Sequence, residues 1–99
     1  MPLLEISIVP VGTNTPSFSS DVVDAVRLIE NRGLKYQVTP TSTVIEGEIP
    51  ELMGVAQEIH QRTMEGGPSR VITHMTIDER ADKEVGIQQQ VDTVHQSLR

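Results

Sequence analysis

Most of the side chains in this sequence that could bind a ligand carry hydroxyl groups, and they occupy alternate positions in segments of strand-like pattern. Ser7 lies between Ile6 and Ile8, and the same alternation continues at Thr39. Alternate residues of a strand share one face of its sheet. Hydroxyls both donate and accept hydrogen bonds, so such a face suits a polar heterocycle. The pattern also has a purely structural explanation, because threonine favours strands.

Two titratable residues also fall within predicted strands. His74 lies mid-strand, where an imidazole could hydrogen-bond a ligand or gain charge in mild acid, and where packing at an interface is the alternative. Glu46 follows Val44 and Ile45, an unusual position for a carboxylate. It could face a cationic ligand, form an intersubunit salt bridge or be exposed at the end of its strand.

The sequence lacks the usual signs of a catalytic or metal centre. It has no cysteine, so it has neither a thiolate nucleophile nor a thiolate metal ligand. His60 and His95 fall on separate predicted helices without a recognisable ligand spacing, and we expect both on the surface. The glycines at Gly12 and Gly66-Gly67 match no phosphate-binding motif. The residues by themselves therefore indicate no metal site, no nucleotide-binding motif and no thiolate nucleophile.

Length, composition and charge restrict the class of protein. A chain of 99 residues predicts one domain over 1–99, and its modest core makes oligomerisation a ready source of further burial. The net charge of -6, with Tyr36 and Phe18 the only aromatics, disfavours nucleic-acid binding. A small neutral or cationic partner fits better. The beginning of the sequence resembles a strand rather than a signal peptide or membrane span, and we expect a cytoplasmic protein.

The elements that position these residues follow from hydrophobic periodicity. Alternation predicts strands over 4–11, 34–39, 43–48 and 70–78, with a turn near Pro40-Thr41-Ser42. Helical spacing predicts a helix capped by Ser19 or Ser20 and ended by Gly33, and a second that begins at Pro50 and ends before Gly66. A third helix follows Asp82 as a cap, with a narrow apolar stripe of Ile87, Val91, Val94 and Leu98.

The order strand, helix, strand, strand, helix, strand is the split pattern of ferredoxin-like α+β folds, with an additional C-terminal helix here. Both long helices then cover one face of an antiparallel sheet. The other face is open to solvent, a partner or a ligand. We expect it to carry the function, with the following residues on it: Glu5, Ser7, Val9, Gln37, Thr39, Ile72, His74 and Thr76.

Three segments together resemble a known family. They are Val9-Pro10-Val11-Gly12-Thr13, Thr43-Val44-Ile45-Glu46-Gly47, and Arg70-Val71-Ile72-Thr73 leading into Ile77-Asp78-Glu79-Arg80. In this order the chain resembles the small single-domain relatives of the YkoF-like thiamine- and hydroxymethylpyrimidine-binding proteins over almost its whole length. The resemblance implies a ferredoxin-like fold, dimers that pair into tetramers, and binding of thiamine or its pyrimidine portion without catalysis or cofactor.

The resemblance also implies which residues contact the ligand. At the matching positions these are Ser7 on the first strand, Thr39, and Thr43 and Glu46 in the third-strand motif, with Thr41 and His74 as further candidates. The family motif has a glycine immediately before the threonine, whereas this chain has Ser42. Serine adopts positive φ less readily than glycine, so we expect the hairpin turn to differ.

Two other functions fit the same residues. The open face could serve only as an oligomer interface in a structural or regulatory subunit, with its hydroxyls as strand formers. Alternatively, the chain could be a cofactor-independent enzyme of this fold class with His74 as the base.

Overall fold

The protein is a four-stranded antiparallel sheet, of strand order β2-β3-β1-β4, with helices packed against it. The computed structural model describes residues 1–12, 19–82 and 86–98. The predicted ferredoxin-like α+β fold is confirmed. Its elements, in chain order, are β1 (Leu3–Val11), α1 (Ser19–Asn31), β2 (Lys35–Val38), β3 (Thr43–Glu46), α2 (Ile49–Glu65), β4 (Arg70–Asp78) and α3 (Ile87–Ser97).

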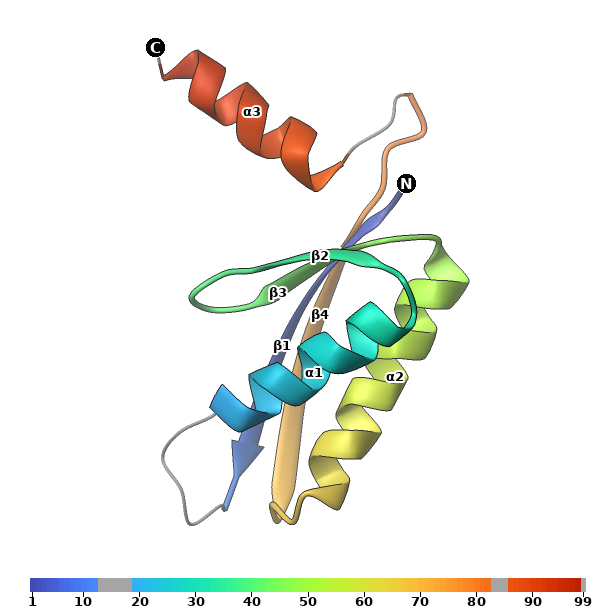
Figure 1. Ribbon diagram of the computed structural model, residues 1–99, viewed down its shortest axis with the longest axis vertical. Coiled ribbons are helices and arrows are strands. Elements are labelled where there is room, and N and C mark those ends of the chain that lie inside the picture. The colour runs from blue at the N-terminus through green and yellow to red at the C-terminus, as the bar shows by residue number, and fades with distance from the viewer. Residues whose placement is uncertain (13–18, 83–85, 99) are drawn as a thin grey trace.

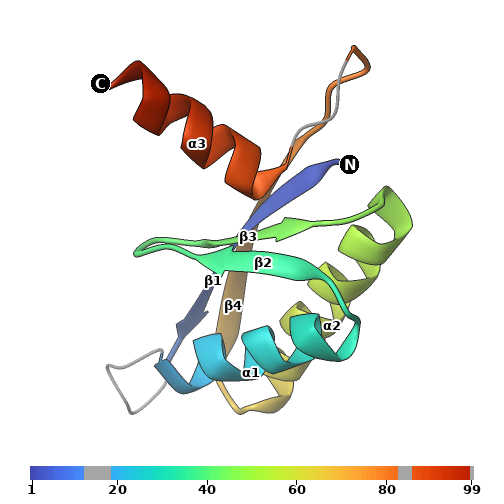
Figure 2. The ribbon, with the colours of Figure 1, turned by 45° about the horizontal axis from the view of Figure 1, so that its top comes forward.

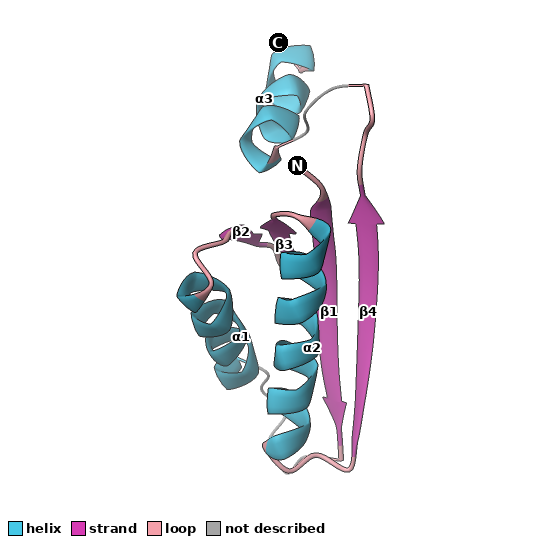
Figure 3. Cartoon of the chain, turned by 90° about the vertical axis from the view of Figure 1, so that its right-hand side faces the viewer, coloured by secondary structure: helices cyan, strands magenta, loops and turns pink. Residues whose placement is uncertain are grey.

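Helices α1 and α2 lie side by side on one face of the sheet (Figure 1). Figure 3 shows α2 running alongside β1, with β4 at the outer edge of the sheet. The core lies between these layers because each element contributes its apolar face to it. The buried hydrophobic residues are Leu4, Ile6, Leu28, Ile29, Ile45, Leu52, Val55, Ala56 and Ile59.

The unequal lengths of the strands leave part of β1 unpaired on one side. β4 pairs with β1 along its whole length, from Leu3↔Asp78 to Val11↔Arg70. β3 pairs with β1 only from Leu3↔Glu46 to Ile6↔Thr43, because the chain turns back into the β2–β3 hairpin there. Among the described strands, none pairs with the β3 side of β1 beyond Ile6.

Helix α1 ends as predicted at Gly33 but begins differently. The Gly33 N–H donates to the Glu30 carbonyl at 2.9 Å, and the Leu34 N–H donates to the Ile29 carbonyl at 3.3 Å. This pair of bonds is a Schellman motif, and it requires the positive φ of 70° that Gly33 adopts. The helix already includes Ser19 and Ser20, so neither serine precedes it as a cap.

Helix α2 is connected to both of its neighbours by polar contacts. Arg32, beyond the end of α1, lies 3.7 Å from Glu51 and 3.6 Å from Glu58 on α2. On the other side, His60 Nδ1 lies 2.6 Å from Thr73 Oγ1 on β4. The expectation that His60 is a surface residue was therefore wrong: it is half-buried and joins the helix to the edge strand.

Helix α3 lies on the opposite side of the sheet from α1 and α2 (Figure 2). Its N-cap is Gly86, so Asp82 does not cap it as predicted; the Asp82 carboxylate instead accepts hydrogen bonds from Arg80. The predicted stripe is present, but only its first half faces the sheet. Val94 and Leu98, at its far end, are 57% and 77% exposed.

Candidate functional site

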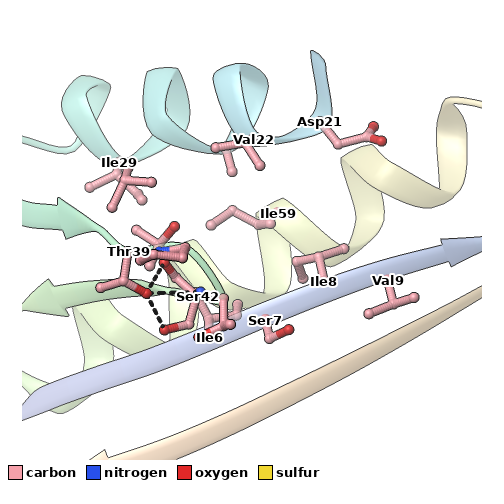
Figure 4. A pocket seen from close by; sticks show the side chains of 15 residues that line it. Ile6, Ser7, Ile8, Val9, Asp21, Val22, Ile29, Thr39, Ser42 and Ile59 are labelled. Carbon is pink, nitrogen blue, oxygen red and sulfur yellow. Dashed lines mark hydrogen bonds between the residues drawn. The ribbon is translucent and has the colours of Figure 1, made fainter. Parts of the chain in front are cut away.

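A cavity lies at the edge of the sheet, between the first half of α1, the β2–β3 hairpin and the unpaired part of β1 (Figure 4). Its volume is about 250 Å³, slightly below the roughly 300–1,000 Å³ usual for drug-sized ligands. The residues that line it are Ile6, Ser7, Ile8, Val9, Asp21, Val22, Ala25, Ile29, Val38, Thr39, Pro40, Thr41, Ser42, Thr43 and Ile59. We call this cavity the hairpin pocket.

Four of the predicted site residues line the hairpin pocket together: Ser7, Thr39, Thr41 and Thr43. Alternation predicted the open face for Ser7 and Thr39, and the pocket instead adjoins the helix-covered face. The reason is the early end of β3. Beyond Ile6 the bare edge of β1 lets consecutive residues border the cavity, whichever face their side chains occupy.

The hydroxyls in this pocket differ in how far they are already hydrogen-bonded. Thr43 is only 8% exposed, yet its hydroxyl bonds to no other described residue. In the described structure, every fully buried side-chain polar atom has a hydrogen-bond partner, so this unpartnered hydroxyl is not fully buried. The Thr43 hydroxyl is therefore accessible from the cavity. Ser7 and Thr41 likewise have no side-chain partner among the described residues. A ligand can bond to these hydroxyls without breaking existing bonds.

Thr39, in contrast, holds the hairpin together. Its hydroxyl donates to the Ser42 carbonyl at 2.9 Å and accepts from the Ser42 N–H at 3.0 Å, and its own N–H donates to the Ser42 carbonyl at 2.8 Å. The side chain thus closes the turn in place of a backbone carbonyl. No described residue other than glycine has positive φ, so Ser42 makes this turn without the backbone conformation that favours glycine.

The bare edge of β1 adds main-chain groups to the site. Alternate residues of a strand direct both N–H and C=O toward the same edge. Along Ser7–Val11 the described structure places no strand against the β3 side, so the part of this edge that lines the pocket, at Ser7–Val9, presents main-chain groups to it, whereas Pro10 has no N–H to donate. Together with the free hydroxyls they provide paired donors and acceptors, which an aminopyrimidine ring needs.

The other two predicted site residues, Glu46 and His74, do not line the hairpin pocket. His74 is exposed on the open face, where it is paired with Ser7 across β1 and β4. Glu46 is half-buried at the opposite end of β3, and its Oε1 would lie 3.1 Å from a Cβ placed on Gly86. The Glu46 carboxylate therefore lies beside the positively polarised N-terminus of α3.

The segment Thr43–Gly47, one of the three that resemble the family, also has a structural explanation. Thr43 faces the pocket, Ile45 is fully buried in the core, and a Cβ on Gly47 would lie 2.9 Å from Leu34 Cδ2. Each of these positions is constrained by packing. Only Thr43 in this motif contributes to the pocket.

A second hollow, of about 360 Å³, lies between the open face and α3. This hollow is larger than the hairpin pocket and more open to solvent. Thr39 borders both cavities. The remaining residues that line it are Leu3, Glu5, Gln37, Val44, Thr76, Asp78, Ile87, Gln90 and Val91. The open face is thus partly covered by the chain's own last helix.

Sequence reasoning missed the contribution of α1 and α2 to the site. Asp21, Val22 and Ala25 come from the first turns of α1, and Ile59 comes from α2. Val22 is an apolar residue of α1, yet it is 40% exposed where it lines the pocket. Only the structure reveals that exposure.

The described lining of the hairpin pocket offers hydrogen-bonding and apolar groups. Its described lining contains hydroxyls, one carboxylate and apolar side chains, but no histidine, lysine or arginine. In the described structure none of these hydroxyls is hydrogen-bonded to a carboxylate or an imidazole, the contact that activates a hydroxyl as a nucleophile. In the described parts of the chain, no group of three or more His, Asp or Glu residues could hold a metal ion. None of the described helices has the length and apolar character needed to cross a membrane.

Known proteins resemble this chain along its whole length. The uncharacterised protein YqgV of Bacillus subtilis, of the UPF0045 group, is 37% identical over 103 residues, which cover 100% of this chain and 99% of the relative. A UPF0045 protein of Staphylococcus xylosus is 35% identical, over 99% of this chain and 95% of its own length. The similarity to known proteins, which the sequence shows in three segments, therefore extends over the whole chain.

Solved structures show the same fold. The hypothetical protein MJ1052 of Methanocaldococcus jannaschii superposes with a TM-score of 0.86 at 30% identity, covering 95% of each chain. A candidate thiamine biosynthesis or salvage protein of Thermotoga maritima superposes with a TM-score of 0.78 at 25% identity, covering 94% of this chain and 97% of its own. The family model described as thiamine-binding protein matches residues 4–95. The chain is a member of the thiamine-binding protein family.

Proposed function

We propose that the protein binds thiamine, or its hydroxymethylpyrimidine portion, in the hairpin pocket without catalysing a reaction on it. The membership of the chain in the thiamine-binding family supports the ligand class. The unpaired hydroxyls of Ser7, Thr41 and Thr43 around one small cavity support the location. A carrier, sensor or salvage protein needs this kind of reversible binding.

The chemistry of the pocket matches that of the ligand. The pyrimidine ring carries donors and acceptors in one plane, which the free hydroxyls and the bare edge of β1 can satisfy. Its flat faces suit the apolar side chains of Ile6, Ile8 and Ile59. The single described aromatic residue, Tyr36, packs against the core on the helix side, so binding depends on shape and hydrogen bonds rather than on stacking.

The Thr43 hydroxyl is the observation that carries this proposal. It belongs to an almost buried residue that lines the cavity, and it has no described partner. Because this hydroxyl is accessible from the cavity, it is available to a ligand. A ligand that accepts or donates there gains a hydrogen bond without breaking one within the protein.

Isothermal titration with thiamine and with hydroxymethylpyrimidine tests the proposal. We expect saturable binding of at least one of them, and Thr43→Val should weaken it by about 3- to 10-fold, the worth of one hydrogen bond, without lowering stability. Thr76→Val, on the open face, is the matched control and should leave affinity unchanged. Absence of heat and of a thermal shift with both compounds would contradict the proposal.

The same variants separate the alternatives. In a purely structural subunit, Ser7→Ala and Thr43→Val would change the mass measured by light scattering and not ligand affinity. We expect these variants to change ligand affinity and not the mass.

Dimers that pair into tetramers remain our proposal for the assembly, supported by the long free edge of β4 and by the exposed Val94 and Leu98 of α3. In an enzyme with His74 as base, His74→Ala would abolish turnover; we expect no turnover of thiamine by either protein.

A further inference from the structure

One charged side chain borders the hairpin pocket. Among its described lining residues, only Asp21 carries a formal charge, and the rest are apolar or bear hydroxyls. Asp21 belongs to the first turn of α1 and is half-buried. A carboxylate partly shielded from water interacts more strongly with a nearby cation than one on an open surface does.

The position of Asp21 divides the pocket into two chemically different ends. In Figure 4, Asp21 lies on α1 toward the same end of the pocket as Ile8 and Val9 of β1, whereas Thr39 and Ser42 lie toward the other end, at the hairpin. The apolar side chains of Val22 and Ile59 lie between the two ends. One end of the pocket therefore offers neutral hydrogen-bonding groups, and the other offers a negative charge.

The Asp21 carboxylate has no basic partner within the described residues. The ion pairs there join Arg32 with Glu51 and Glu58, and Arg80 with Asp82. Arg62 borders a neighbouring crevice together with Asp21 but forms no salt bridge with it. The ordinary role of an acidic residue at this position is to stabilise the N-terminus of its helix. That role does not require the residue to border a cavity.

We propose that Asp21 determines the ligand specificity of the hairpin pocket by pairing with a positive charge on the bound heterocycle. This inference rests on the proposed function. It orients the ligand with its pyrimidine at the hairpin hydroxyls and its cationic ring beside the first turn of α1. It also ranks the ligands: thiamine, with its permanently charged thiazolium, binds more tightly than hydroxymethylpyrimidine, which lacks that ring.

Titrations of the whole chain with the two compounds test this ranking. Asp21→Asn should weaken thiamine binding by about 3- to 10-fold, as expected for a partly screened charge pair, and leave hydroxymethylpyrimidine affinity nearly unchanged. Asp21→Glu, which keeps the charge, should retain most of the preference for thiamine. Raising the salt concentration should weaken thiamine binding to the unmodified protein and have little effect on Asp21→Asn.

Asp24→Asn is the matched control, because Asp24 lies one turn further along α1, is exposed and does not line the hairpin pocket. It removes one negative charge from the same helix and should preserve the ratio of the two affinities. If Asp21→Asn lowers both affinities equally, or neither, Asp21 supports only the helix and the inference is wrong. If the unmodified protein binds neither compound, the proposed function fails and the inference fails with it.

Discussion

At the scale of single residues, the hydroxyls of the β2–β3 hairpin have two different functions. Thr39 and Ser42 bond to each other and close the turn, while Thr41 and Thr43 have no side-chain partner among the described residues. Sequence pattern treats all of them alike, because each is a polar residue in or near a strand. The network of hydrogen bonds distinguishes a residue that builds the site from one that is available to a ligand.

Replacement of Thr39 by valine should therefore destabilise the protein. The change leaves the part-buried Ser42 N–H without its acceptor at 3.0 Å, and we expect a loss of about 1–3 kcal/mol in the free energy of unfolding. Urea denaturation followed by circular dichroism measures this loss. Thr41→Val, two residues along the same turn and exposed, is the control and should change stability by less than about 0.5 kcal/mol. Equal stability of the two variants would show that the Thr39 hydroxyl does not hold the turn.

At the scale of elements, the helices are fixed to the sheet by a few specific contacts as well as by the core. The hydrogen bond between His60 and Thr73 crosses from α2 to β4, the outer strand of the sheet. Since α2 runs alongside β1, this hydrogen bond adds a contact between the helix and β4 at the edge of the sheet (Figure 3). A histidine in the middle of a helix thus has a structural function that its spacing in the sequence does not suggest.

A double-mutant cycle of His60→Ala and Thr73→Val should reveal this coupling. We expect an interaction energy of about 0.5–1.5 kcal/mol between the two sites, the usual net contribution of a hydrogen bond. Denaturant unfolding of the two single variants and of the double variant measures it. The control cycle pairs His60→Ala with Thr76→Val, on the opposite face of the same strand, and should be additive. A coupling indistinguishable from this control would mean that the contact contributes nothing to stability.

At the scale of the whole molecule, stability is concentrated on one side of the sheet. The buried core lies between α1, α2 and the sheet, whereas α3 contains no buried residue in its described length. The hollow beneath α3 separates part of this helix from the open face. The last helix is therefore attached to the fold without belonging to its core, and its exposed apolar residues are available for contacts between molecules.

Truncation of one apolar side chain in each region should show this difference. Ile45 is fully buried, so Ile45→Ala should cost about 2–5 kcal/mol of unfolding free energy. Val94 is 57% exposed, so Val94→Ala should change it by less than about 0.5 kcal/mol. Thermal and urea denaturation at low protein concentration provide both values. A large loss in Val94→Ala that grows with protein concentration would mean that α3 stabilises an assembly rather than the single chain.

The amino-acid sequence by itself determined the order and type of the elements. Strand alternation, the stop at Gly33 and the start near Pro50 are local signals, and each was confirmed because neighbouring residues generate it. The buried position of Ile6, opposite in face to Ser7, followed from the same alternation. The resemblance in three short segments correctly identified the family.

Only the tertiary structure shows where the hairpin pocket, the site that we propose for the ligand, lies. The pocket exists because β3 ends opposite Ile6 while β1 continues, and that difference in length depends on pairing between distant segments. It also brings Asp21 of α1 to the same cavity as Ser7 and Thr43. The hydrophobic periodicity of single segments does not predict that these three residues line one cavity. Alternation placed Ser7 on the open face, but the bare strand edge, rather than the face, brings Ser7 into the hairpin pocket.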